Sequence, residues 1–122
     1  MAMYVEIDLD IPRKMRYAYN DIADVEERAG MGIGAMFNEQ RTGFHTIRLL
    51  IWGGLKWKEK GMTPHMAGDI IQEYLKNGGT FEEMMQKVRE ALEKSGIVKF
   101  AEANEDDEDD EDSEGNVQTE RA

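Results

Sequence analysis

The segment IRLLIWGGLKWKEKG, residues 47–61, reads as part of a helix with two tryptophans and two adjacent glycines in its middle. A glycine costs a helix interior about 0.8–1.0 kcal/mol relative to alanine. Placing Gly53 and Gly54 side by side in one helix is therefore destabilising unless close packing requires it. The apolar residues around these glycines indicate how the rest of the chain is arranged around this helix.

Helical periodicity predicts one broad apolar face on this helix, which we expect to extend from residue 42 to residue 60. At about 100° per residue, Gly54 lies near the middle of that face. The missing side chain leaves a notch, against which an N-terminal hairpin or another helix can pack closely. Gly53 lies outside the face and stays unexplained by this argument. The face comprises Phe44, Ile47, Leu50, Ile51, Gly54 and Leu55, and Trp57 borders it.

Leu49 and Trp52 project to the opposite side of the helix and form a second, smaller apolar patch among polar groups. Two interpretations of this patch are open. The helix could be central and covered on both sides, which would place both residues in the core. Alternatively, the patch could meet a second copy of the chain or a partner, because tryptophan is enriched at the hot spots of protein interfaces.

Three further residues join these two as candidates for partner binding. Trp57 stands at the border of the core face, and Met62 and Met66 follow the helix. Methionine side chains adapt to irregular surfaces, so they suit a protein that accommodates a partner. The same property lets methionine fill gaps in a core, and this second role is also open for both methionines.

Residues 3–9 and residues 14–19 each alternate between apolar and polar side chains, which predicts two β-strands. Pro12 marks the turn between them, because proline fixes its own φ angle. We expect a hairpin over residues 3–19 that packs on the rest of the protein, since an isolated hairpin is only marginally stable. Its apolar positions are Met3, Val5, Ile7 and Leu9 on the first strand and Met15, Tyr17 and Tyr19 on the second.

Capping residues predict where the helices begin and end. Asn20 is a suitable N-cap and Gly30 a suitable end for the first helix. Thr63 and Thr80 are suitable N-caps for two later helices, the first followed by Pro64 and the second by a glutamate at the capping-box position. We therefore expect an α+β, mostly α-helical fold with the hairpin packed on a bundle of about four helices. The expected helices are residues 20–29, 42–60, 63–77 and 80–95, within a single globular domain of residues 1–100.

The net charge of −11 is concentrated at the C-terminal end of the chain. Residues 101–122 contain eleven acids and one base, whereas residues 1–100 contain fifteen acids and fourteen bases. The acidic segment has too little apolar surface to offset the entropy of ordering, so we expect a disordered tail. Neither part has the basic stripe of a nucleic-acid-binding protein, and no nucleic-acid partner is expected.

No arrangement of residues indicates an enzyme, a cofactor or a metal site. The chain has no cysteine, and His45 and His65 do not form an HExxH-type pair. The glycines around residue 32 do not follow the order of a dinucleotide-binding loop. No apolar run approaches the roughly 20 residues that cross a membrane, and the N-terminus lacks the apolar stretch of a signal peptide. We expect an intracellular, non-enzymatic protein without a membrane partner.

Four segments carry a resemblance to a known family, in the order YAYNDIADVEERAGMGI, IRLLIWGGLKW, TPHMAGDIIQEYL and FEEMMQKVREALEKSG. The most specific part is the Glu-Glu-x-x-Gly step at residues 26–30 followed by Trp-Gly-Gly-Leu at residues 52–55. The ordered combination resembles the tail assembly chaperones of long-tailed bacteriophages, including those of gene transfer agents and prophages. The resemblance covers about residues 4–97.

This resemblance implies a small, non-enzymatic, mostly helical chaperone in the host cytoplasm. Such proteins bind the tape measure protein, keep it soluble, and are displaced by the tail tube protein when the tube polymerises around it. Members of the family are therefore absent from the mature virion. It has no catalytic residues to carry over, and self-association is possible.

A small helical regulatory or DNA-associated protein is the alternative, because the helices expected at residues 63–77 and 80–95 could form a helix-turn-helix. The second of these helices, however, alternates acids and bases on its polar side. Such a surface is a poor match to phosphates. Its acids are Glu82, Glu83, Glu90 and Glu93.

Overall fold

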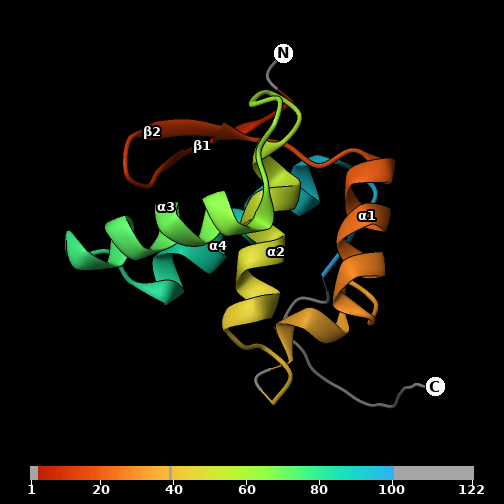
Figure 1. Ribbon diagram of the computed structural model, residues 1–122. Coiled ribbons are helices and arrows are strands. Elements are labelled where there is room, and N and C mark those ends of the chain that lie inside the picture. The colour runs from red at the N-terminus through yellow and green to blue at the C-terminus, as the bar shows by residue number, and fades with distance from the viewer. Residues whose placement is uncertain (1–2, 39, 101–122) are drawn as a thin grey trace.

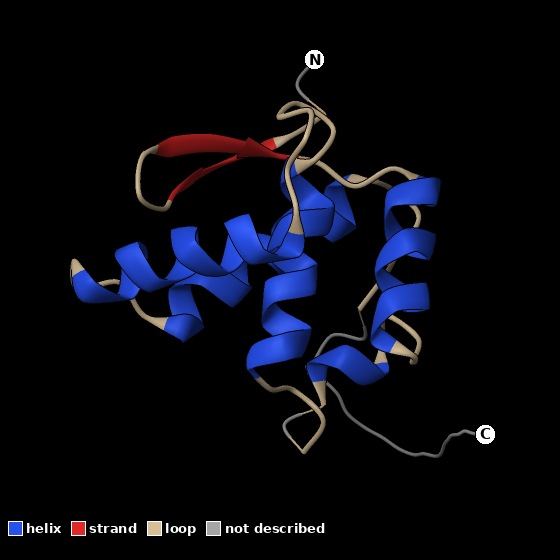
Figure 2. Cartoon of the chain, in the orientation of Figure 1, coloured by secondary structure: helices blue, strands red, loops and turns tan. Residues whose placement is uncertain are grey.

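The computed structural model describes residues 3–38 and 40–100, which form a two-stranded hairpin and four α-helices (Figure 1). This confirms the predicted α+β, mostly helical fold, with the hairpin lying across the helices (Figure 2). The predicted disordered tail, residues 101–122, lies outside the described residues. The elements are β1 Val5–Asp8, β2 Pro12–Met15, α1 Tyr19–Ala29, the short 3₁₀ helix η1 Ala35–Phe37, α2 Phe44–Leu55, α3 Pro64–Lys76 and α4 Phe81–Lys94.

Helix α2 is the centre of the protein. It contacts α1, α3, α4 and β2, and Figure 1 shows α1 beside it on one side and α3 on the other. Nine of its twelve residues are buried, so it is covered almost all round rather than along one face. A helix that is apolar on every side belongs in a core. Of the two interpretations of the second apolar patch, the central helix covered on both sides is therefore the correct one.

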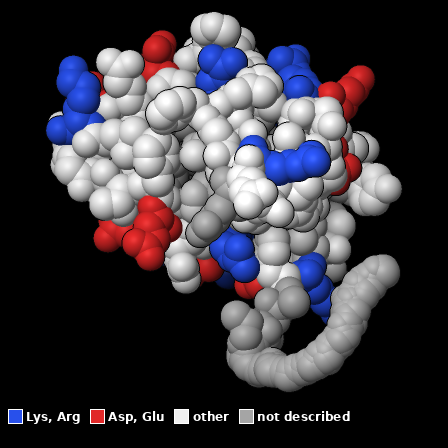
Figure 3. Space-filling view, turned by 90° about the horizontal axis from the view of Figure 1, so that it is seen from below, with Lys and Arg blue, Asp and Glu red and all other residues white. Residues whose placement is uncertain are grey.

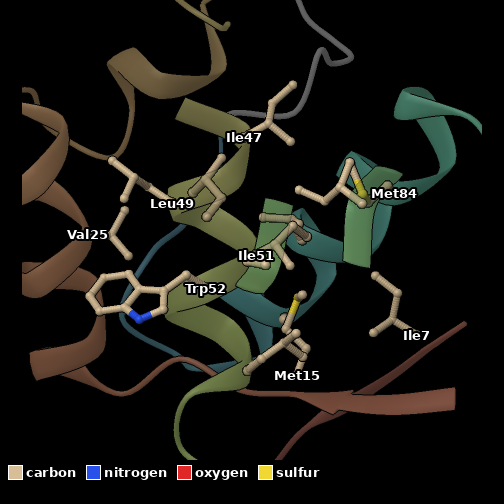
Figure 4. Close-up of a cluster of buried hydrophobic side chains, with 14 of the residues drawn as sticks. Ile7, Met15, Val25, Ile47, Leu49, Ile51, Trp52 and Met84 are labelled. Atoms are coloured by element: carbon tan, nitrogen blue, oxygen red, sulfur yellow. The ribbon is translucent and has the colours of Figure 1, made fainter. Parts of the chain in front are cut away.

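Gly53 is the place where α1 meets α2. A Cβ atom added at Gly53 would lie 2.2 Å from Cγ2 of Val25 on α1, which is far inside van der Waals contact. Val25 is completely buried, and Figure 4 shows it on the side of α2 that also carries Trp52. Only a residue without a side chain allows this approach. The glycine that periodicity left unexplained is thus the contact point for the second covering helix.

Gly54 is in close contact with the segment at the end of β2. A Cβ atom there would lie 2.5 Å from Cγ of Met15 and 2.9 Å from Cζ of Tyr17. The backbone N–H of Arg16 donates to the Gly54 carbonyl at 2.9 Å, and the Tyr17 hydroxyl donates to the carbonyl of Leu50. Complete burial raises the pKa of Tyr17 far above its ordinary value, so the phenol stays a neutral donor. The predicted role of Gly54 is confirmed.

The predicted caps of the third and fourth helices are confirmed. The Thr63 hydroxyl accepts the Met66 N–H at 3.1 Å, and the Thr80 hydroxyl accepts the Glu83 N–H at 3.1 Å. Each bond satisfies one of the backbone donors that a helix start leaves without an intrahelical partner. Gly30 ends α1 with a φ of 73°, as expected for a glycine after a helix.

The start of α1 differs from the prediction. The N-cap is Ala18 rather than Asn20, because the Asp21 carboxylate accepts the Ala18 N–H at 3.0 Å and starts the helix earlier. Strand β2 ends at Met15, so Tyr19 is not a strand residue. Its side chain is 71 % exposed, and its expected place on the buried side of the hairpin is wrong.

Helix α2 ends at Leu55 rather than at residue 60. The N–H of Lys58 bonds the Leu55 carbonyl three residues back at 3.3 Å, so the chain tightens and leaves the helical path. The Trp57 indole N–H donates to the carbonyl of Lys14 on the hairpin at 3.2 Å. Trp57 therefore contacts the hairpin from the loop after α2, and it does not border the apolar face of a continued helix as periodicity predicted. Gly61 lies in the loop after α2 with a φ of 86°.

Two groups of ion pairs hold the covering elements against the end of α2. Lys56 lies 2.7 Å from Asp21 and 3.0 Å from Asp24, which ties α1 to this end. Partial burial alone would lower the pKa of Lys56, but its hydrogen bonds to these two carboxylates outweigh burial and leave the pKa raised. Arg13 bonds both Asp10 in the hairpin turn and Glu59 after α2. The hairpin is thus fixed at its turn as well as at Gly54.

Gly53→Ala is expected to destabilise the protein, although alanine normally stabilises a helix interior relative to glycine. The added methyl group overlaps Val25, so we expect the free energy of unfolding to fall by about 2 kcal/mol or more. Chemical denaturation followed by circular dichroism measures the change. Gly34→Ala is the matched control: no atom of the described residues lies within 4 Å of a Cβ there, and its φ is −63°.

A double-mutant cycle with Val25→Ala isolates the contact. Removing Cγ2 of Val25 makes room for the new methyl group, so Gly53→Ala should cost about 1 kcal/mol less in the Val25→Ala background than in the natural sequence. Equal costs in both backgrounds would mean that α1 does not pack on Gly53.

Candidate functional site: an apolar groove beside Arg48

An open groove with a volume of 480 Å³ lies where the start of α2, the side of α3 and the start of α4 come together. We call it the α2–α3 groove. Its lining is mainly apolar and has a few polar groups at the edge, which is the usual character of a binding surface. The lining residues are Phe44, His45, Ile47, Arg48, Gly68, Ile71, Gln72, Leu75, Lys76 and Phe81.

Two phenylalanines at helix starts form one end of the groove. Phe44 is the first residue of α2 and Phe81 the first residue of α4, and their ring centroids are 6.1 Å apart. Phe44 is 82 % exposed, the largest exposure of any large apolar side chain in the described part of the chain. An exposed aromatic ring next to an apolar groove offers surface that a partner can cover.

The turn between α3 and α4 fixes the position of Phe81. The Tyr74 hydroxyl donates to the Thr80 carbonyl at 2.7 Å and accepts the Thr80 N–H at 3.1 Å. The Tyr74 ring lies so close to Gly79 that a Cβ there would come within 2.3 Å of it. Gly79 thus permits close packing of the Tyr74 ring on the turn, and this packing holds Phe81 in position at the end of the groove.

Arg48 lies along the groove with its stem against Gly68. A Cβ atom at Gly68 would come within 3.2 Å of the Arg48 Cδ, so the small residue makes room for the stem. The Arg48 Nε is buried and has no hydrogen-bond acceptor in the described part of the chain. One terminal nitrogen lies 3.5 Å from His45 Nδ1, which is at the limit of a hydrogen bond. The terminal guanidinium nitrogens, at an exposed contact with His45, can pair with an anionic group.

The charges lining the groove have one sign. Arg48, Lys76 and His45 are its charged or titratable residues, and none of the described aspartates or glutamates lines it. A ligand that matches this surface combines apolar side chains with at least one carboxylate. An amphipathic helix with an acidic residue beside its apolar stripe has this chemistry.

A second hollow continues the apolar surface around Phe81. Its volume is 510 Å³, and it shares Ile47 and Phe81 with the α2–α3 groove. Met85 lines it and is partly exposed. A flexible methionine beside two neighbouring hollows can adjust to partners of different shape.

Three of the five predicted partner-binding residues are in the core. Leu49, Trp52 and Met62 are at most 8 % exposed, and the Trp52 indole N–H donates to the Met62 carbonyl at 3.0 Å. Of the two interpretations of Leu49 and Trp52, the partner-facing patch is wrong and burial in the core is right, because α1 covers that side of α2. The guanidinium of Arg28 on α1 lies 4.6 Å from the centre of the Trp52 ring and packs on it.

The other two predicted residues reach the surface but lie apart from the groove. Met66 is 46 % exposed on α3, and Trp57 is partly buried against the hairpin. Neither lines the α2–α3 groove. Sequence reasoning missed Phe44 as a site residue because periodicity assigned it to the core face. Its position at the start of the helix could have indicated that Phe44 is exposed. The other elements cover the later part of α2 and leave its first residue open.

Comparison with protein-family models, curated proteins and solved structures finds no match to this chain. Within residues 3–38 and 40–100, no three histidine, aspartate or glutamate side chains lie together as a metal site. No helix in the described part is long and apolar enough to cross a membrane. The groove is therefore interpreted from its own residues.

Trp52→Ala tests whether Trp52 is a core residue or a contact residue. Because its ring fills the space between α1 and α2, we expect the free energy of unfolding to fall by about 3–5 kcal/mol. Met66→Ala removes an exposed side chain and should change it by no more than about 0.5 kcal/mol. An unchanged melting temperature for Trp52→Ala would contradict this assignment.

Proposed function

We propose that this protein is a non-enzymatic tail assembly chaperone that binds the tape measure protein of a long phage or prophage tail. The order of sequence features from residue 4 to residue 97 supports this assignment. The observation that carries it is the α2–α3 groove, which is mainly apolar and open, and which within residues 3–38 and 40–100 is lined by cations without a carboxylate. Such a groove suits helical segments that would aggregate if left exposed.

The proposed binding mode is a helix lying in the groove. Apolar residues spaced three or four apart on the partner helix would cover Phe44, Leu75 and Phe81. Each square ångström of apolar surface removed from water contributes about 25 cal/mol. A partner carboxylate would also pair with the terminal nitrogens of the Arg48 guanidinium. The two contributions together select amphipathic rather than purely apolar segments.

Release is as necessary to this function as binding, because the tail tube protein must replace the chaperone. The groove is open to solvent, and the Phe44 side chain at its end is mostly exposed. A partner helix in such a groove keeps one side exposed to solvent. The tube protein can therefore reach the bound helix before the chaperone has left it.

The DNA-associated alternative gains no support from the surface charges. Acids and bases are interspersed on the face seen in Figure 3, and neither sign forms a continuous stripe there. On α4 the glutamates at positions 82, 83, 90 and 93 are all exposed beside Lys87 and Arg89. Phosphate binding favours clustered bases, so the groove remains the stronger basis for a function.

Co-expression tests the proposed function directly. The tape measure protein encoded near this chain's gene should give a higher soluble yield with the chaperone than without it, and the two should co-purify. An equally insoluble tape measure protein in both cases would refute the proposal.

Phe44→Glu tests the groove within the same assay. A glutamate in the first turn of a helix is favoured by the helix dipole, so the fold should be retained. We expect at least a tenfold loss of affinity for the tape measure protein, which corresponds to about 1.4 kcal/mol. Tyr19→Glu is the matched control, because Tyr19 is also an exposed aromatic residue in the first turn of a helix but lies outside the groove.

Thermal unfolding of both variants accompanies the binding measurement. Equal melting temperatures with a selective loss of binding for Phe44→Glu would support the groove as the binding site. Equal binding by both variants would place the site elsewhere on the protein and would leave the chaperone assignment to the co-expression result.

A further inference from the structure

The outer side of β2 is occupied by the rest of the fold. The Lys14 carbonyl accepts the indole N–H of Trp57 at 3.2 Å. The N–H of Arg16, which follows β2, donates to the Gly54 carbonyl of α2 at 2.9 Å. Pro12, the first residue of β2, has no N–H to offer. The outward backbone groups of β2 are therefore unavailable to a further strand.

The hydrogen-bond pattern of the hairpin shows which backbone groups of β1 point away from β2. The Leu9 N–H donates to the Ile11 carbonyl at 3.1 Å, so these two residues form a hydrogen-bonded pair. Hydrogen-bonded and non-hydrogen-bonded pairs alternate along an antiparallel ladder. In the observed register, Asp8 and Glu6 are one and three residues before Leu9 and stand in non-hydrogen-bonded pairs. The N–H and C=O groups of Glu6 and Asp8 therefore point to the side opposite β2.

These outward groups are open on β1, unlike those on β2. Outside the hairpin, no residue within 3–38 and 40–100 bonds the backbone N–H or C=O of Glu6 or Asp8. Both side chains are exposed. The strand thus presents two N–H donors and two C=O acceptors on every second residue, which is the arrangement to which an added strand pairs.

A hollow of 590 Å³ lies between β1 and the start of α4. Ile7 points from the hairpin toward Met84 of α4 (Figure 4), and both residues are buried. They line the hollow together with Tyr74 of α3. An added strand therefore has an apolar floor beneath its inward-facing side. We call the outward backbone groups of Glu6 and Asp8, together with this hollow, the β1 edge.

The charges at the β1 edge are mainly negative. Among the described residues, none of its four acids has a cation within 4 Å. Lys14 stands opposite Glu6, but its ammonium lies over the Tyr4 ring, 5.0 Å from the centroid. Lys87 pairs with Glu90, which does not line the hollow, at 3.6 Å. The acids are Glu6, Asp8, Glu82 and Glu83, and the bases are Lys14 and Lys87.

Charge and register together determine which strand fits this edge. The residues of an added strand opposite Glu6 and Asp8 form hydrogen-bonded pairs with them and place their side chains on the same, outer face. Opposite charges across such a pair are favourable, so lysine or arginine fits at both positions. The residue between them faces the hollow beside Ile7, where an apolar side chain fits. The matching segment is therefore basic–apolar–basic.

A second copy of the chain is a poor match to the β1 edge. Two such edges placed together would set the carboxylates of Glu6 and Asp8 against the same carboxylates of the other copy, which is destabilising. Lys14, Met15 and Arg16 have the required alternation, but the outward groups of this segment are already bonded within the fold. Charged residues on an edge strand prevent pairing between copies. Here the same carboxylates favour a basic strand.

We propose that the β1 edge binds an extended basic–apolar–basic segment of a partner protein as a third strand of the hairpin. The backbone of the segment bonds Glu6 and Asp8, and its two basic side chains pair with their carboxylates. Its apolar side chain enters the hollow beside Ile7. The hollow shares no lining residue with the α2–α3 groove, and the proposal does not rest on the function proposed for that groove.

Amide hydrogen exchange in the full-length protein tests whether the edge is open. The Ile7 amide donates within the hairpin, so the Glu6 and Asp8 amides should exchange at least about tenfold faster than it does. Equal protection at the three positions would contradict an open edge. Protection of Glu6 and Asp8 that rises with protein concentration would show that a second copy occupies the edge, and would overturn the proposed partner.

A short peptide tests strand addition. The probe is the acetylated and amidated peptide Ser-Lys-Val-Arg-Val-Ser at low salt, which at about 1 mM should slow exchange of the Glu6 and Asp8 amides at least about fivefold. The peptide's Lys and Arg N–H groups face β1, so N-methylation of both should weaken binding at least about fivefold, whereas N-methylation of both valines should not. No protection, or equal binding of the two methylated peptides, which carry the same charge, would overturn strand addition.

Neutralised variants of the protein locate the binding site of the unmethylated peptide. Glu6→Gln together with Asp8→Asn removes two cross-strand ion pairs and should weaken binding about fivefold. Glu27→Gln together with Glu93→Gln is the matched control, because both residues are exposed acids outside the β1 edge and the change in net charge is the same. An equal effect of the two double variants on the affinity would place the peptide elsewhere and refute the proposal.

Discussion

The close approach of two different elements to two neighbouring glycines determines the structure. Gly53 receives Val25 of α1, and Gly54 receives Met15 and Tyr17 at the end of the hairpin. Successive residues of a helix point about 100° apart, so two adjacent glycines open two separate sides of the same helix. The cost in helix propensity, about 2 kcal/mol for the pair, is offset by packing that no larger residue allows.

This arrangement explains the division between core and surface. With α1 on one side and the hairpin on another, the C-terminal half of α2 is enclosed and Trp52 is buried. The first turn of α2 projects beyond both covers, which leaves Phe44 exposed and gives the α2–α3 groove its open end. The α2–α3 groove, which is the site proposed for the partner, is therefore open because α1 and the hairpin do not cover the first turn of α2.

The sequence predicted those features that depend on local chemistry. The hairpin and the threonine caps follow from short patterns whose physical causes lie within a few residues, and helical periodicity placed Gly54 in the middle of the apolar face. Gly53 and Trp52 could not be assigned, because periodicity shows which side of a helix is apolar but not how many neighbours cover it. The end of α2 was missed for a similar reason, since the indole of Trp57 bonds a hairpin residue 43 positions away. The groove combines three helices, and no local pattern places Phe44, Arg48 and Phe81 together.

Native-state hydrogen exchange on Gly53→Ala and Gly54→Ala tests most directly whether the two glycines serve two separate contacts. Methyl groups on different sides of α2 should loosen different elements, because local openings reflect the contacts that hold each element. Gly53→Ala should accelerate exchange of the α1 amides more than that of the hairpin amides, and Gly54→Ala should do the reverse. The same pattern of acceleration in both variants would contradict the account.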